Sequence, residues 1–576
     1  MRLQVVETKN AASFYVVKST YQKGRRSNRI VEKLGTYQHL LVKLNGRDPY
    51  EWAAEYVEQL NQQEKEARRT ALVPYSPVNR IEKDGQRLYN GGYLFLQKLY
   101  HELGLDRICG AISKRHGFAF DLDAILSRLV YGRILFPCSK QATLRLSEKL
   151  IEPPNFEIQH IYRALEIIAD EGDYIQSQLY ANSKKLSKRN TGVLYYDCTN
   201  FFFEIEQEDQ DTEEEKGLRK YGYSKDHKPN PIVQMGLFMD GDGVPLAFCI
   251  NPGNTNGQTT LQPLERKILK DFELSRFVVC TDAGLSSADN RIFNDRQERA
   301  FVTTQSVKKL KADIKKWALS PTGWRLTGDP NFYDITQLNE EDDLDKTFYK
   351  ERWIEDEGLR QRLIVSFSLK YRCYQQKIRA SQIQRAQKAI DSDSDKIIVN
   401  QNDYRRFIQK THATTQGELA SKTAYSINLD RIAQEAQYDG LYAVCTNLQD
   451  DVAEILRVNK RRWKIEESFR VMKSEFKARP VYLSRNDLIR AHFITCFIAL
   501  LLFRILEKRL QEKYSSHQII DTLKNMDFLA IEGEGYTPVY TRTDLTDDLH
   551  NALGFFTDFE LISSSYMKSI LSSTKN

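Results

Sequence analysis

An aspartate in the middle of an apolar, strand-like run constrains this chain more than any other feature. The run VLYYDCTNFFFEI, residues 193–205, is rich in β-branched and aromatic residues, which favour strands. Side chains alternate between the two faces of a strand, so Asp197 shares a face with Tyr195 and Thr199. A carboxylate in so apolar a strand is unfavourable unless it is paired, hydrogen-bonded or metal-bound. The run therefore predicts a buried strand with a site residue at its centre.

The residues after this run predict strands that alternate with helices. Two more apolar runs are joined by the turn GDG, and a third, shorter run ends at Asp282. The expected elements are strands over 231–240 and 244–250, a helix over 259–272, and strands over 277–281 and 300–304. A meander of three strands followed by alternating α and β elements indicates a single α/β domain.

Asp282 is the second candidate site residue. In an α/β sheet, residues just past the carboxyl end of a strand line the ligand crevice, and Asp282 has this position. A Gly turn and a helix follow, and the start of that helix carries Ser286 and Asp289 in a capping-box arrangement. The alternative, purely structural explanation is that Asp282 forms an Asx cap on this helix.

The third candidate acid, Glu466, lies in the charged segment VNKRRWKIEESFRVMKSEFK, residues 458–477. The segment has no Pro or Gly, and its apolar residues recur at helical spacing, which predicts one amphipathic helix. Arg462, Glu466 and Lys473 fall on one stripe of that helix, with Arg470 beside it. Taken alone, the stripe is explained better by ion pairs on a solvated helix than by a site. The two upstream aspartates favour a site.

Two other segments carry unusual charge patterns. The acidic stretch 204–216, followed by a basic stretch over 218–228, predicts a mobile, solvated loop between the first two strands. The segment after residue 304 opens with lysines 308, 309, 311, 315 and 316, which would extend a binding groove for an anionic partner. Trp317 and Trp324 fit core packing better than stacking on a bound partner.

Composition is that of an ordinary soluble protein, with 28% charged residues and a net charge of +6 over 576 residues. Eight cysteines without a CxxC pair argue against a zinc ribbon and a disulfide framework and fit a reducing cytosol. The N-terminal residues contain no apolar h-region, so we expect no signal peptide. The longest apolar run, residues 493–503, is too short to span a bilayer and predicts a buried core helix. We therefore expect a cytoplasmic protein with no membrane partner.

The order of expected elements is that of a ribonuclease H-like domain, and here the chain resembles the DDE transposases of bacterial insertion sequences. YYDCTN matches the first-acid strand at Asp197, and TDAGLSS matches the end of the second-acid strand at Asp282. The resemblance is to the branch with a Tyr-x2-Arg-x3-Glu-x6-Lys motif, which places the third acid at Glu466. The Tyr position of that motif holds Asn459, so the contact of that phenol is lost or replaced.

The resemblance implies an α/β ribonuclease H-like catalytic domain with a β-containing insertion, flanked by mostly helical N- and C-terminal regions. A basic hairpin tip near the N-terminus contains Lys23, Arg25, Arg26 and Arg29. We expect a β-hairpin and helix contacting DNA over 1–75, a helical region for DNA binding or dimerisation over 76–190, catalytic residues over 191–304, the insertion over 305–447, the Glu helix over 448–480 and a helical region over 481–576.

The implied activity is metal-dependent cleavage of DNA at element ends and strand transfer into target DNA. Asp197 would bridge two Mg²⁺ ions about 3.5–4 Å apart, with Mn²⁺ as a substitute, and Asp282 and Glu466 would each hold one ion. The expected DNA-binding residues are Arg462, Lys473, Arg470 and Lys225. The expected partners are terminal inverted repeats, target DNA and a second copy of the chain in a homodimer.

Two alternatives stay open on the sequence alone. A ribonuclease H-like nuclease would use the same acids for hydrolysis without strand transfer. A non-catalytic DNA-binding derivative of a transposase would keep only end recognition, although the intact acids at 197, 282 and 466 argue against decay.

Overall fold

The computed structural model describes residues 1–8, 11–22, 25–44, 48–67, 73, 77–78, 80–213, 215–296, 298–392, 403–413 and 419–576. These residues form two compact units, which are described separately. The smaller unit comprises Met1–Tyr89, Phe528–Val539 and Thr557–Ile570, and the larger unit contains Asn90–Asp527, Tyr540–Phe556 and Leu571–Asn576. The sequence also predicts a linker over 73–80, of which residues 74–76 and 79 lie outside the described residues.

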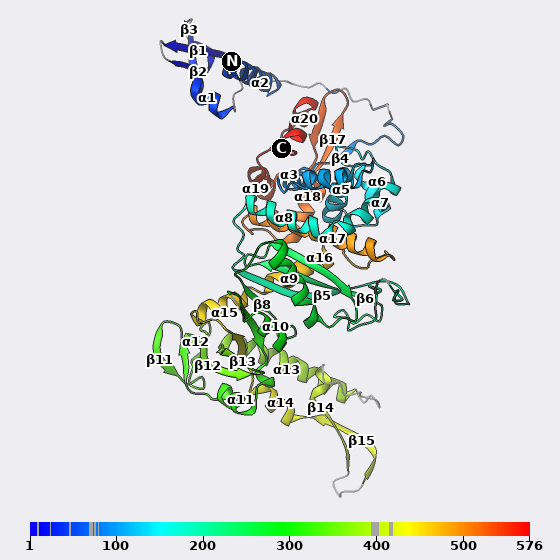
Figure 1. The fold of residues 1–576 in the computed structure, drawn as a ribbon, viewed down its shortest axis with the longest axis vertical. Helices are drawn as coiled ribbons and strands as arrows, with labels where there is room; N and C mark the ends of the chain where they lie inside the picture. Colours follow the sequence, from blue (N-terminus) through cyan, green and yellow to red (C-terminus); the bar gives the residue numbers. More distant parts are fainter. Residues whose placement is uncertain are drawn as a thin grey trace. The chain divides into compact units, whose positions relative to one another are not determined.

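The smaller unit begins with a three-stranded antiparallel sheet, as Figure 1 shows in blue. Its strands are β1 (Arg2–Thr8), β2 (Ala11–Gln22) and β3 (Arg25–Thr36), and its helices are α1 (Tyr37–Lys43) and α2 (Pro49–Ala67). Phe14, Leu40 and Ala53 form its buried core. The expected hairpin is present as β2 and β3, but Lys23 at its tip lies outside the described residues. A second sheet has the order β19-β18-β17-β4, from Ile562–Ser563, Gly535–Pro538, Asp527–Ile531 and Leu88–Asn90.

The larger unit is built on one ten-stranded mixed sheet in the described residues, with the order β11-β10-β12-β13-β16-β9-β8-β5-β6-β7. One half consists of β5 (Val193–Phe202), β6 (Ile232–Asp240), β7 (Pro245–Pro252), β8 (Val278–Thr281) and β9 (Ala300–Gln305). In this half β6 is antiparallel to both neighbours, whereas β5, β8 and β9 are parallel. All five strands were expected from the sequence.

The alternation along β5 separates two cores, one on each face of the sheet. Leu194 and Tyr196 pack with the helix α9 (Leu261–Asp271), which follows the short helix η1 (Gly257–Thr260). Tyr195, on the other face, packs with Val452 and Ile455 of α15 (Val452–Lys460). Because both faces are covered, β5 is buried along almost its whole length. Asp197 therefore lies on a strand that helices cover on both faces.

The other half of the sheet comes from the residues expected to form an insertion. Its strands are β10 (Trp324–Leu326), β11 (Asp329–Tyr333), β12 (Phe348–Asp356), β13 (Leu359–Phe367) and β16 (Leu441–Thr446). They continue the sheet beyond β9, because β16 pairs antiparallel with it. The remaining elements are η2 (Val307–Lys309), α11 (Ala312–Leu319), α12 (Glu340–Asp343), α13 (Leu369–Asp391), η3 (Tyr404–Phe407), β14 (Ile408–Ala413), β15 (Leu419–Ile427) and α14 (Leu429–Ala436). Trp324 is fully buried in the core here and Trp317 packs against it, as expected.

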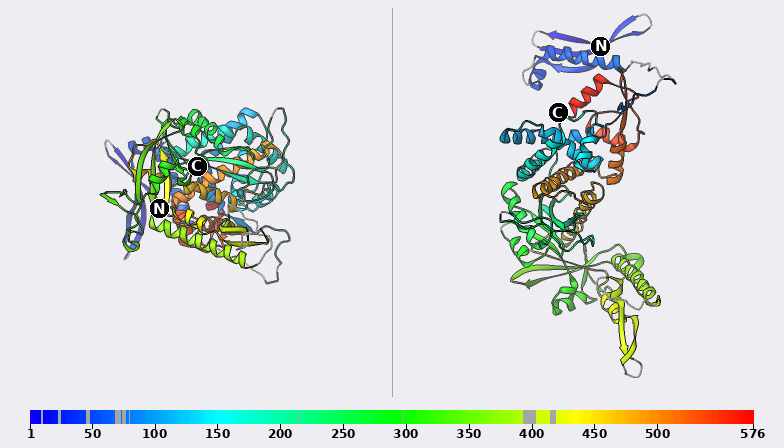
Figure 2. Two further views of the ribbon diagram at one scale, coloured as in Figure 1. Left: turned by 90° about the horizontal axis from the view of Figure 1, so that it is seen from below. Right: turned by 90° about the vertical axis from the view of Figure 1, so that its right-hand side faces the viewer.

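Helices from both ends of the sequence pack together in the larger unit. They are α3 (Tyr93–Glu102), α4 (Leu105–His116), α5 (Leu122–Leu135), α6 (Lys140–Ser147), α7 (Ile158–Asp170), α8 (Gly172–Leu186), α17 (Asn486–Arg509), α18 (Ser516–Asn525) and α19 (Asp544–Leu553). Most of the C-terminal helix, α20 (Ser564–Ser573), belongs to the smaller unit. Figures 1 and 2 show α17 in orange among these helices. It contacts α5, α7 and β7, and the ring of Phe493 packs at a tilt against that of Phe201 of β5. In the described residues α17 alone has the length and composition of a membrane span, but it is a buried core helix.

The single helix expected over 458–477 is in fact two helices, α15 and α16 (Trp463–Ser474). The break falls at Arg461 and Arg462, where backbone bonds span three residues instead of four: Arg462 N donates to Asn459 O, and Ile465 N donates to Arg462 O. Such tighter bonds satisfy the backbone groups at a helix end. Glu466 consequently lies in the first turn of α16 rather than in mid-helix.

The acidic and basic stretches between β5 and β6 form an irregular and largely exposed connection, as expected of a solvated loop, and they also pair with each other. Asp209 pairs with Arg219 at 2.5 Å, and Asp211 pairs with Lys220 at 2.9 Å. The connection also binds α17, because Leu218 N donates to the side-chain oxygen of Asn486. Its opposite charges lie in two halves of one connection, which folds back on itself.

Candidate active site

Asp197 and Asp282 lie on neighbouring parallel strands. Tyr195 of β5 is paired with Cys280 of β8, and continuing this register past the end of β8 sets Asp197 opposite Asp282. The charge on Asp282 raises the pKa of Asp197, so the two carboxylates interact. Two acids predicted from separate strand patterns are thus adjacent.

Asp197 is buried and 7% exposed. One carboxylate oxygen accepts a hydrogen bond of 2.7 Å from Cys198 N. Burial raises the pKa of Asp197 to about 6, and the neighbouring Lys225 acts in the opposite direction. The charged form of a buried carboxylate beside a second one is stabilised by hydrogen-bond donors and by cations. This pair is therefore suited to bind positive charge.

Asp282 begins the turn after β8. Its Oδ1 accepts a hydrogen bond of 3.0 Å from Leu285 N, so part of the structural explanation is correct. The helix that follows, α10 (Ala288–Phe293), is capped by Ser287, which accepts from Asn290 N, and not by the expected pair of Ser286 and Asp289. The N-cap of this helix was predicted one residue too early, because the turn after Asp282 is longer than a direct strand-to-helix junction.

Glu466 does not join the aspartates directly. Its carboxylate is 57% exposed and forms an ion pair of 3.0 Å with Arg462. Within the described residues, no three His, Cys, Asp or Glu side chains are grouped closely enough to hold a metal ion. Arg462 connects the acids instead: burial disfavours its charge, but Glu466, Asp197 and further anionic neighbours outweigh burial and raise the pKa of Arg462. The guanidinium therefore lies within electrostatic reach of all three acids.

Asn459, at the departure from the motif, is buried beneath Arg462. Its Nδ2 donates to the phenol oxygen of Tyr442 at 2.8 Å, and this phenol lies 2.7 Å from the Thr304 hydroxyl. Tyr442, on β16, also contributes to the electrostatic environment of Arg462. The phenol of Tyr442, on strand β16, thus reaches Asn459 on helix α15. Sequence spacing contained no signal for it, because the contact joins residues from separate elements.

The four expected DNA-binding residues have different positions. Lys225 donates to the carbonyl oxygen of Cys198 beside Asp197, and Arg462 lies among the acids. Lys473 pairs with Asp226 at 3.6 Å and lies over the Phe201 ring.

Arg470, the fourth of these residues, is 71% exposed and pairs with Glu467. No contact described in the structure joins it to the three acids.

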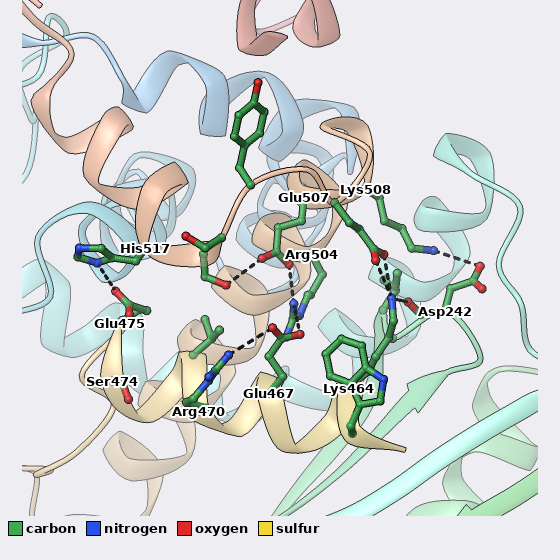
Figure 3. A pocket seen from close by; sticks show the side chains of 18 residues that line it. Asp242, Lys464, Glu467, Arg470, Ser474, Glu475, Arg504, Glu507, Lys508 and His517 are labelled. Carbon is green, nitrogen blue, oxygen red and sulfur yellow. Dashed lines mark hydrogen bonds and ion pairs between the residues drawn. The ribbon is translucent and has the colours of Figure 1, made fainter. Parts of the chain in front are cut away.

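A cavity of about 380 Å³ lies beside α16, lined by Arg470 and by residues of α17 and its surroundings. Figure 3 shows that charged side chains from α16 and α17 point toward one another in it. Arg504 of α17 pairs with Glu507 at 2.5 Å and with Glu467 at 3.3 Å, and it donates to the Ser468 hydroxyl. These contacts hold α16 against α17 and so support the position of the helix that carries Glu466.

The order β7-β6-β5-β8-β9, with its two aspartates, is consistent with a ribonuclease H-like transposase fold. Residues 202–502 match the family model described as "Transposase DDE domain", and the chain belongs to this family. Asp282 and Glu466 lie inside the matched range, and Asp197 precedes its first residue. Membership implies a transposase or nuclease enzyme, and DDE transposases act on DNA and generally use divalent metal ions.

A solved structure, a cryo-EM structure of the piggyBac transposase synaptic complex with hairpin DNA, is similar to the chain with a TM-score of 0.36 and 9% sequence identity. The similarity covers 85% of this chain and 88% of that chain. No curated protein sequence is significantly similar to the chain.

The donor groups fit a hard divalent cation. Asp197 and Asp282 each use one carboxylate oxygen for a backbone N–H in the bonds described, and Mg²⁺ prefers carboxylate oxygens. Two adjacent carboxylates, one of them buried with a raised pKa, have the electrostatic character of a cation site. Glu466 is not part of this pair, because its carboxylate is paired with Arg462.

Proposed function

We propose that this chain is an insertion-sequence transposase that cleaves DNA at element ends and transfers the strand into target DNA through Asp197, Asp282 and Glu466. The observation that carries the proposal is the adjacency of Asp197 and Asp282 on parallel strands, with Arg462 linking them electrostatically to Glu466. Terminal inverted repeats and target DNA are the proposed substrates, and the strands after β9 are the proposed insertion. A homodimer would bring two element ends together.

Each residue has a proposed role in this chemistry. Asp197, Asp282 and Glu466 would hold two Mg²⁺ ions, or Mn²⁺ in their place, which lower the pKa of the attacking water and stabilise the leaving 3′-oxygen. Arg462, released from Glu466, would contact a phosphate beside the scissile bond. Lys225 and Lys473 would position the DNA backbone on the β5 side, and Arg470 would contact DNA farther along α16.

The decisive experiment is Mg²⁺-dependent cleavage and joining of labelled element-end DNA by the intact protein and by Glu466→Gln. We expect joined products from the intact protein and none from the variant, with DNA binding retained. Nicking without joining would favour a hydrolytic nuclease. Binding without metal-dependent chemistry by either protein would leave a non-catalytic DNA-binding derivative.

Glu475→Gln is the matched control for this experiment. Glu475 follows α16 and pairs with His517 at 3.6 Å, so the substitution makes the same change in charge near the end of the same helix. We expect its cleavage rate to stay within about threefold of the intact protein, because partly exposed ion pairs contribute little. An equal loss in both variants would mean that any charge change near α16 disables the enzyme.

DNA binding should depend on pH through Lys473. Burial lowers the pKa of this ammonium to about 8, with Arg479 and Lys225 acting in the same direction and Asp226 opposing them. A phosphate contact requires the charged form, so Kd should be constant below pH 8 and rise above it, by about tenfold per pH unit at most. Titrations with labelled duplex between pH 7 and 9 measure this. Lys473→Arg should bind with a flat profile, because arginine stays charged throughout.

A further inference from the structure

The loop before β6 places an acid against two cations on the edge of the candidate site. The carboxylate of Asp226 pairs with Lys473, which follows Glu466 on α16, and with Arg479 beyond the end of that helix. The three side chains are 20%, 12% and 26% exposed, so solvent reaches the group. Asp226 and Arg479 were not predicted as site residues, because their contact joins distant parts of the sequence.

The group rests on the strand that carries Asp197. Lys473 lies 5.5 Å from the ring centroid of Phe201, and Arg479 lies 5.5 Å from that of Phe202. A further cation, Lys228, lies 5.7 Å from the Phe202 ring. Three cations therefore lie against the rings of Phe201 and Phe202 at the end of β5.

Positive charge exceeds negative charge in this group. Asp226 is the one anion that raises the pKa of Lys473, whereas burial, Arg479 and Lys225 lower it. The carboxylate of Asp226 thus pairs with two cations, Lys473 and Arg479, and a third cation, Lys228, lies nearby. Lysine and arginine around a single oxygen anion are the ligands that proteins use for phosphate groups.

The loop that carries Asp226 has an unfavourable backbone conformation. His227, the next residue, has φ of 54°, in the left-handed region that residues other than glycine seldom adopt. Lys228 N donates to the Ser224 hydroxyl, which closes the turn.

We propose that Lys473 and Arg479 form a binding site for a DNA backbone phosphate, and that the carboxylate of Asp226 occupies this site until a phosphate displaces it. Asp226 is then an internal competitor that weakens binding to DNA in general. The inference rests on the proposed function for its partner, DNA, and adds Arg479 and Asp226 to the binding surface. It requires no catalysis.

The test is the binding of a labelled duplex of about 20 base pairs and arbitrary sequence, in EDTA, to the full chain and its Asp226→Asn variant. We expect the variant to bind about tenfold more tightly at low salt. The slope of log Kd against log salt should be similar for the two proteins, since the phosphate makes the same contact in both once Asp226 is displaced. Arg479→Ala should weaken binding, and Asp226→Asn/Arg479→Ala should lose most of the gain.

Asp173→Asn is the matched control, because Asp173 is an exposed carboxylate that pairs with a single lysine, Lys267. Its affinity should change less than twofold. Unchanged or weaker binding by Asp226→Asn, or an equal gain in Asp173→Asn, would overturn the inference. Asp226→Ser serves if the asparagine variant does not fold. Tighter binding by Asp226→Asn in a protein that never cleaves DNA would leave the inference standing while the proposed function fails, and cleavage with no effect of Asp226 would do the reverse.

Discussion

Asp197→Asn is expected to lower the rate of DNA cleavage at least ~10³-fold without unfolding the protein. The carboxylate is buried beside Asp282, and the amide that replaces it has nearly the same size but no charge to bind a cation. Loss of about 4 kcal/mol of transition-state stabilisation corresponds to about 10³ in rate, which is the scale of metal-ion catalysis. Single-turnover cleavage of element-end DNA measures the loss.

The stability of the folded protein, unlike the rate of cleavage, should not fall in Asp197→Asn. The pKa of Asp197 is raised by burial to about 6, so the folded protein keeps this proton to higher pH than the unfolded chain does. The stability of the native protein should therefore fall between about pH 4 and pH 6 and then level off, by at most ~3 kcal/mol. Asp197→Asn removes this fall and should melt at the same or a higher temperature than the native protein at pH 7.5.

Metal binding separates this explanation from a general defect. Mg²⁺ or Mn²⁺ should raise the melting temperature of the native protein, because a ligand that binds only the folded state stabilises it. Asp197→Asn should show little of this increase, whereas Asp173→Asn should show all of it. Cleavage by Asp197→Asn at a rate near that of the native protein would exclude this carboxylate from the site.

The sequence was sufficient for the strands and for the pairing of the two aspartates. Apolar runs with an acid at a strand centre or strand end are local patterns, and parallel β5 and β8 then set Asp197 opposite Asp282. The adjacency follows from topology once each strand is identified.

Features that depend on contacts between distant residues were not predictable. The break between α15 and α16 has no Pro or Gly to mark it and consists of a shift to shorter backbone bonds near Arg462. The approach of Tyr442 to Asn459, and that of Asp226 to Lys473, joins separate elements. In each case the residue types are ordinary, and only the folded arrangement gives them a role.

The position of Glu466 shows both what the sequence could predict and what it could not. Its helical spacing from Arg462 and Lys473 was visible in the sequence, but its ion pair with Arg462, rather than a place beside the aspartates, was not. An exposed glutamate in the first turn of a helix is free to change partners, since partly exposed ion pairs are weak.

Arg504→Met is expected to destabilise the protein by about 3–5 kcal/mol at pH 7, because it leaves buried Glu507 without its counter-charge. Burial raises the pKa of Glu507, and Arg504 opposes this shift in the native protein, so the variant should raise it further. A raised pKa makes the folded state bind the proton more strongly. The defect should therefore be largest at neutral pH and shrink toward pH 5. Urea unfolding at both pH values measures it.

The effect should extend to activity, because Arg504 also binds Glu467 and Ser468 on the helix that carries Glu466. We expect the variant to cleave more slowly even where it is fully folded, since a loosened α16 holds Glu466 less well. Lys508→Met is the control on the same helix: its ion pair with Asp242 is partly exposed and should contribute less than about 1 kcal/mol. Adding Glu507→Gln to Arg504→Met should restore part of the stability, because the unpaired charge is then gone. A double variant as unstable as Arg504→Met alone would place the loss in packing rather than in charge.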